Sequence, residues 1–106
     1  MTQLEFIEQI IKEKEAVILD ANDKIWSYAE LPYEETRSSA LLCSILESEG
    51  FTVETGVAEI PTAFVARYVV GTGKPVMGIL GEFDALATLS QKAGCTVKDP
   101  VQNGGF

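Results

Sequence analysis

The residues with the clearest chemical potential are two carboxylates, Glu82 and Asp84, which follow a short apolar run. This run, residues 76–80, has the sequence VMGIL and ends at Gly81, so both acids come directly after it. In α/β folds, functional side chains are concentrated just beyond the carboxyl ends of buried strands. The position of Glu82 and Asp84 therefore predicts that they lie at a functional site.

A complete metal site is not predicted from this chain alone. The sequence contains no histidine and two cysteines, whereas a zinc site needs at least three protein ligands. We interpret Cys43 as a small core residue of a helix, because no histidine is present to activate its thiol. Cys95 is predicted to be an exposed bystander in a loop, with metal ligation as the less favoured alternative. We expect the isolated chain to bind zinc only weakly.

The composition limits the kinds of partner. The chain has 106 residues, 46% of them apolar, and carries 16 acidic against 8 basic residues, a net charge of −8. One domain is expected at this length, and the acidic balance argues against a nucleic-acid partner. No apolar stretch approaches the roughly 20 residues that cross a bilayer. The sequence starts without a signal-peptide pattern, so two reduced cysteines in a cytoplasmic protein are expected.

A long amphipathic helix is predicted at the start. Thr2 and Glu5 fit a capping box. Apolar residues then recur at three-four spacing, which predicts one buried face: Leu4, Ile7, Ile11, Ile18, Ala21, Ile25 and Tyr28. We expect this face to pack on its own domain, with a coiled-coil partner as the alternative.

A second helix is predicted between Pro32 and Gly50. The residue before a proline leaves the α region, so the first helix should end there. Glu34 and Glu35 would then lie in the first turn of the new helix, where acids suit the positive end of the dipole, and Gly50 suits its C-terminal end. The expected buried residues, with Cys43 nearby, are Ala40, Leu41, Ile45 and Leu46.

Three strands are predicted after Gly50, at residues 51–55, 62–70 and 75–80, with a hairpin turn at residues 71–74. The third is continuously apolar, which is typical of a strand covered on both faces. From Ala87 onward the pattern predicts a loop of nearly twenty residues, through Gly104 and Gly105. The expected fold is α/β, with two N-terminal helices followed by strands of a mixed sheet. Because covering helices are lacking, we expect residues 1–106 to be the first part of a larger domain.

Three segments carry a resemblance to a known family. They are residues 25–39 (IWSYAELPYEETRSS), 56–66 (GVAEIPTAFVA) and 78–86 (GILGEFDAL). In this order they resemble the N-terminal part of the zinc-peptidase amidohydrolases of the aminoacylase and carboxypeptidase type. Within that family they are most similar to the branch of proteins that are like the B subunit of p-aminobenzoyl-glutamate hydrolase.

The resemblance implies a di-metal enzyme, using zinc or manganese, that cleaves the amide bond of N-acyl amino acids or dipeptides. It implies an α/β catalytic domain with a mixed sheet and a smaller inserted domain through which full-length members form homodimers. Many members end a strand in histidine, any residue, aspartate. Asp84 matches the aspartate that orients the metal-binding histidine, and Glu82 stands at the histidine position, as a candidate metal ligand.

The same resemblance implies that the main metal motif follows a loop like residues 94–105, so this chain is expected to stop before it. Two functions stay open. The chain is either an N-terminal fragment of a metal-dependent amidohydrolase, inactive when isolated, or a non-catalytic α/β domain for binding or self-association. Whether this polypeptide is itself an enzyme is also open.

Overall fold

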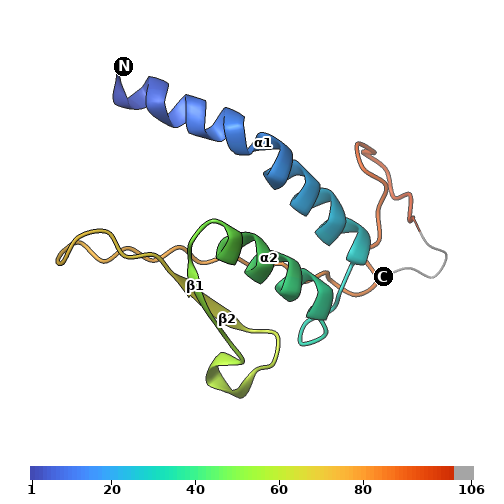
Figure 1. Cartoon of the computed structure of the whole chain (residues 1–106). Coiled ribbons are helices and arrows are strands. Elements are labelled where there is room, and N and C mark those ends of the chain that lie inside the picture. Colours follow the sequence, from blue (N-terminus) through green and yellow to red (C-terminus); the bar gives the residue numbers. More distant parts are fainter. Residues whose placement is uncertain (102–106) are drawn as a thin grey trace.

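The computed structural model describes residues 1–101 and shows two helices and one small sheet (Figure 1). In chain order these are α1 (Gln3–Tyr28), α2 (Thr36–Ser48), β1 (Thr52–Thr55), the short 3-10 helix η1 (Val57–Glu59) and β2 (Phe64–Arg67). The α/β class is confirmed at this level. Within residues 1–101, no helix has both the length and the apolar character needed to cross a membrane.

Helix α1 begins as the local sequence predicts, and it ends at Tyr28, before the stop predicted at Leu31. The Thr2 hydroxyl accepts a hydrogen bond from the Glu5 amide at 3.1 Å, and the Glu5 carboxylate accepts one from the Thr2 amide at 3.1 Å. This confirms the capping box. At the other end, Ala29 adopts a left-handed conformation with φ 45° and donates its N–H to the Ile25 carbonyl. The helix therefore stops before Pro32.

Much of the predicted buried face of α1 is exposed, and over the first turns this is because α2 is too short to cover them. With 26 and 13 residues, the helices are about 39 and 20 Å long. They lie antiparallel (Figure 1), and Lys14, in the middle of α1, already pairs with Glu49 beyond the end of α2 at 2.7 Å. The burial prediction was wrong for four residues, which are 53–65% exposed: Leu4, Ile7, Ile11 and Ile18. It was right for Ala21, which is buried, and in part for Ile25 and Tyr28, which are half-buried.

Helix α2 begins at Thr36, so Glu34 and Glu35 precede it and its first turn contains no acid. Their predicted place in the first turn was wrong, and the carboxylate of Glu30 lies at this helix end instead. Gly50, with φ 96°, follows the last turn in the conformation that favours glycine.

The side of α2 that faces the protein differs in part from the prediction. Ser38, Ser39 and Cys43 are buried, which confirms Cys43 as a core residue. The small side chains of Ser38 and Ser39 let other segments of the same polypeptide approach α2 closely. Ala40, predicted to be buried, is exposed because it lies off this face. The other three predicted residues are half-buried: Leu41, Ile45 and Leu46.

The sheet consists of β1 and β2, which pair antiparallel from Thr52 opposite Arg67 to Thr55 opposite Phe64. The first two predicted strands are therefore present but shorter than expected. They form a two-stranded antiparallel sheet, so the predicted mixed sheet is not what residues 1–101 build. The sheet lies against α2 (Figure 1).

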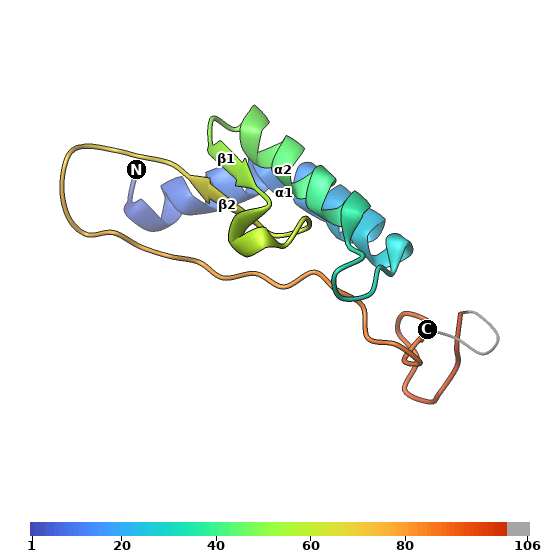
Figure 2. The same ribbon diagram turned by 90° about the horizontal axis from the view of Figure 1, so that it is seen from below.

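The third predicted strand and its hairpin turn were wrong for this structure. Residues 75–80 form no strand, and their large apolar side chains are almost fully exposed, from 85% for Met77 to 101% for Ile79. Figure 2 shows the chain leaving β2, looping outward and returning as a single unpaired trace. A strand buried on both faces needs paired neighbours and covering layers, and the described residues offer neither to this segment.

The predicted loop is confirmed over its described part, since residues 87–101 contain no helix or strand. Gln91 closes the loop on itself: its amide group donates to the Val97 carbonyl at 2.6 Å, and its side-chain oxygen accepts from the Asp99 amide at 2.8 Å. Cys95 is exposed, as predicted. The last predicted loop residues, including Gly104 and Gly105, lie outside the described residues.

Candidate functional site

The carboxylates of Glu82 and Asp84 lie on an extended segment that is anchored through the residues between and beside them. Phe83 and Ala85 are half-buried, whereas Glu82 and Asp84 are exposed. This alternation is typical of extended chain with one face on the protein. The Phe83 ring lies 6.0 Å from the ring of Phe64 in β2, measured between centroids. The segment is thus fixed with both acids free to meet a ligand.

A backbone hydrogen bond provides the second anchor. The N–H of Ala85 donates to the carbonyl oxygen of Glu30 at 2.7 Å. Glu30 belongs to the connection between α1 and α2, so this bond joins parts of the chain that are far apart in sequence. Together with the Phe64–Phe83 contact, it holds residues 81–86 against the helices on one side and β2 on the other.

Glu82 and Asp84 both border a hollow of about 740 Å³. Its walls come from the C-terminal half of α1, from Leu42 of α2 and from the segment 81–91. A volume of this size is in the range of small-molecule sites. The wall is apolar at Ile25 and Trp26, and among the described residues that line it there is no lysine or arginine. The hollow is therefore an apolar recess with an acidic border.

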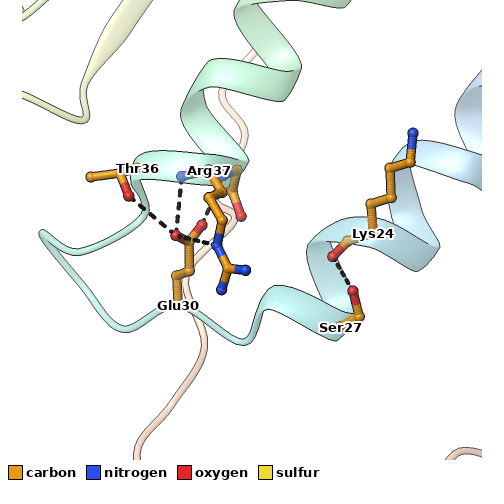
Figure 3. A network of polar contacts seen from close by, with 6 residues as sticks. Lys24, Ser27, Glu30, Thr36 and Arg37 are labelled. Atoms are coloured by element: carbon orange, nitrogen blue, oxygen red, sulfur yellow. Dashed lines mark hydrogen bonds and ion pairs between the residues drawn. The ribbon is translucent and has the colours of Figure 1, made fainter.

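A cluster of polar contacts lies at the N-terminus of α2 (Figure 3). The Glu30 carboxylate accepts hydrogen bonds from the backbone N–H of Ser38 at 2.7 Å and of Arg37 at 3.0 Å. The Thr36 hydroxyl donates to it at 3.4 Å, and the Arg37 Nε lies 3.5 Å away. Free N–H groups at a helix start favour an anion, and Glu30 supplies one from six residues upstream.

The electrostatics of Glu30 follow from this geometry. Burial of its side chain, only 8% exposed, raises the pKa of the carboxyl group. The two backbone N–H groups of Arg37 and Ser38 and the guanidinium charge outweigh that effect and lower the pKa to about 2. Glu30 is thus firmly ionised at neutral pH. The Arg37 guanidinium also lies 4.5 Å from the centre of the Tyr28 ring, which ties the end of α1 to α2.

The sequence prediction missed Glu30. Capping rules consider residues within about three positions of a helix start, and Glu30 lies six positions before Thr36. A signal did exist, since Glu30 stands within the segment 25–39 that carries the family resemblance. The rules instead favoured Glu34 and Glu35, which lie closer in sequence.

The described residues do not fit a zinc or manganese site on their own. Within residues 1–101, no three His, Cys, Asp or Glu side chains lie close enough together to hold a metal ion. Glu82 and Asp84 supply carboxylates from one segment. Cys43 is buried in α2, where burial raises the pKa of its thiol, and Cys95 is exposed in the C-terminal loop. With fewer than three convergent ligands, no metal chemistry is derived from these residues.

Comparison with known proteins shows that the chain is similar to part of a bacterial hydrolase. It is 47% identical over 102 residues to the B subunit of p-aminobenzoyl-glutamate hydrolase from Escherichia coli (strain K12). The match takes in 93% of this chain and 21% of the relative, so the chain spans about a fifth of the relative's length. The resemblance inferred from three segments is confirmed. No family model and no solved structure matches the chain.

Proposed function

We propose that this chain is the N-terminal portion of a metal-dependent amidohydrolase that cleaves the amide bond of N-acyl amino acids or dipeptides. The observation that carries this proposal is the 47% identity, over 93% of the chain, to a protein named as a hydrolase of p-aminobenzoyl-glutamate. A chain of the relative's length would contribute the other ligands and the pocket residues. The isolated chain is proposed to be inactive.

The proposed roles of the two carboxylates follow their position on the hollow. Asp84 would orient a metal-binding side chain from outside this portion, and Glu82 would stand near the zinc or manganese ion. Both are exposed and border a recess of substrate size. Two carboxylates without a cation repel a substrate that itself carries a carboxylate. This repulsion supports the proposal that residues 1–106 neither bind nor hydrolyse such a substrate alone.

A chimera tests the proposal. The matched stretch of the Escherichia coli relative is replaced by this chain, and hydrolysis of p-aminobenzoyl-glutamate is measured with zinc or manganese present. We expect the chimera to keep kcat/KM within about tenfold of the parent, and Asp84→Asn to lower it by about 10–100-fold, as for other residues that orient metal ligands. Glu47→Gln, on the exposed side of α2, is the matched control and should leave kcat/KM unchanged.

Two outcomes would contradict this assignment. A folded chimera without activity would remove the support for the hydrolase, and full activity of Asp84→Asn would remove Asp84 from the site. The isolated chain provides a separate test, because sub-micromolar zinc affinity together with turnover of p-aminobenzoyl-glutamate would overturn its proposed inactivity.

A second candidate function is a non-catalytic domain that self-associates. It is favoured by the nearly full exposure of Val76, Ile79 and Leu80, at 91–101%, since such patches commonly mark interaction surfaces. A defined oligomer in gel filtration with one cooperative melting transition would support it, whereas aggregation without a defined oligomer favours the fragment. The amidohydrolase proposal also includes two further features. The full-length protein would form a homodimer, and it would be located in the cytoplasm with both cysteines reduced.

A further inference from the structure

We propose that Glu30 is a positioning residue for the candidate site. The Glu30 carboxylate is bound to the N-terminus of α2. This positions the backbone carbonyl of Glu30 to accept a hydrogen bond from the Ala85 amide, which holds Glu82 and Asp84 at the hollow. The carboxylate and the backbone carbonyl of Glu30 thereby join the start of α2 to the segment 81–86.

The side chain of Glu30 helps to fix the position of its backbone. It lies in the connection between α1 and α2, where Ala29 and Tyr33 adopt left-handed conformations with φ 45° and 68°. Backbone hydrogen bonds hold its two ends, from the Ala29 N–H to the Ile25 carbonyl and from the Glu34 N–H to the Leu31 carbonyl. Between these ends, the carboxylate of Glu30 makes charge-assisted bonds of 2.7 and 3.0 Å to two backbone N–H groups of α2.

The carbonyl of Glu30 fixes the position of the segment 81–86 along its own direction. The other anchor is the tilted contact of the Phe83 and Phe64 rings, with centroids 6.0 Å apart, an apolar contact that tolerates small shifts along the chain. The 2.7 Å bond from the Ala85 N–H to Glu30 is directional. A shift by one residue would turn Glu82 and Asp84 from the exposed side of the segment toward the protein, because successive side chains of an extended chain alternate.

Asp84 lies between the two anchored residues. Phe83 and Ala85 flank Asp84 in the sequence, and each has its own partner on a different element. Asp84 therefore has little freedom while both contacts hold. This inference concerns position only. It goes beyond the proposed function and does not depend on which metal or substrate the complete protein uses.

Amide hydrogen exchange on the 106-residue chain, measured by NMR, tests the inference. In Glu30→Ala we expect the protection factor of the Ala85 amide to fall about tenfold or more, which corresponds to about 1.4 kcal/mol. Glu30→Gln should give a smaller fall. Glu34→Ala is the matched control, because it removes an exposed carboxylate from the same connection and leaves the contacts of Glu30 in place. It should leave Ala85 protection unchanged.

A reciprocal variant separates positioning from simple stabilisation of α2. Ala85→Pro removes the N–H donor, so we expect the NMR signals of the Phe83 ring to shift while the amides of Arg37 and Ser38 keep their protection. The fluorescence of Trp26, the one tryptophan of the chain and a residue of the hollow wall, should shift in Ala85→Pro and in Glu30→Ala alike.

A role limited to capping α2 would lower the melting temperature and expose the Arg37 and Ser38 amides without changing Ala85. That pattern in Glu30→Ala, with native helix content, overturns the proposal. If Glu30→Ala does not fold, Glu30→Gln decides by the same criterion. Unprotected Ala85 in the parent chain also overturns it. None of these measurements uses hydrolysis, so failure here is distinguishable from failure of the proposed function.

Discussion

The carboxylate of Glu30 and the backbone amide of Ser38, eight residues apart, form a 2.7 Å hydrogen bond at the start of α2. The bond satisfies one of the free N–H groups that every helix leaves at its N-terminus. It is made by an acid that is 8% exposed, so solvent competes little for either partner. Its consequences for stability and pH dependence can be measured directly.

Replacing Glu30 by alanine should destabilise the chain. Hydrogen bonds to a charged, poorly solvated group contribute about 1.5–3 kcal/mol, so we expect Glu30→Ala to lower the free energy of unfolding by that amount in urea denaturation. Glu34→Ala is the control, because Glu34 is exposed and precedes α2. It should stay within about 0.5 kcal/mol of the parent. Equal effects of the two substitutions would contradict the capping role.

Acid should remove the contribution of Glu30 in a defined window. The folded-state pKa of Glu30 is about 2, below its ordinary value of 4.5. The stabilisation is therefore fully present above about pH 4.5 and is lost as the pH falls toward 2. The difference in Tm between the parent and Glu30→Gln, followed by circular dichroism, should be constant above about pH 5 and shrink below about pH 4.5. A difference that does not change as the pH approaches that folded-state pKa would contradict this account.

The two thiols should react at different rates. Cys95 is exposed, whereas Cys43 is 7% exposed and burial raises the pKa of its thiol. Because the thiolate is the reactive form, Ellman's reagent should modify Cys95 at least about tenfold faster than Cys43. Cys95→Ala should leave only the slow reaction, which becomes fast in urea. A fast reaction of Cys95→Ala in native buffer would place Cys43 outside the core.

The ion pair between Lys14 and Glu49 should contribute little despite its short distance of 2.7 Å. Its side chains are 43% and 37% exposed, and exposed pairs are worth about 0.2–1 kcal/mol because water and salt screen them. We expect Lys14→Met to change the free energy of unfolding by no more than that, and by less at about 1 M salt. A loss above about 2 kcal/mol would exceed the range for exposed pairs and would show that the pair, rather than apolar packing, joins α1 to α2.

The unpaired segment 75–80 should make the isolated chain prone to aggregation. Met77 and Ile79 are 85% and 101% exposed, and an exposed apolar run is a template for aggregation. Ile79→Lys should lower both binding of the dye ANS and light scattering on concentration. Val57→Lys, a half-buried site on η1, serves as the comparison and should reduce neither. Unchanged light scattering in Ile79→Lys would show that aggregation starts from a surface other than the segment 75–80.

Local signals predicted the helices well because their determinants are neighbours in sequence. The Thr2–Glu5 capping box and Gly50 after α2 each act within one helical turn. Burial depends on what packs against an element, so the exposure of Leu4 and Ile7 could not be predicted without knowing which turns of α1 lie beside α2. The third strand was wrongly predicted for the same reason. Apolar residues at 75–80 indicate that the segment can pair and be covered, but they do not supply the partner.

The position of the two acids was predictable only in part. The apolar run placed Glu82 and Asp84 at the end of a strand that residues 75–80 do not form, although both acids line the hollow. Their anchors were not found, because the bond between Glu30 and Ala85 joins distant parts of the chain and follows no periodic pattern. Long-range contacts of this kind are set by the tertiary arrangement, which capping and periodicity rules do not describe.

The unequal lengths of α1 and α2 also have a thermodynamic consequence. The first turns of α1 extend past α2, so their stability rests on helix–coil equilibrium, on the capping box and on intrinsic propensity. Such a segment melts gradually, whereas the part beside α2 melts with the core. Unfolding of this chain should therefore depart from a two-state process. The helical circular dichroism signal should decline well before the main transition, while near-ultraviolet signals from Trp26 stay flat until it begins.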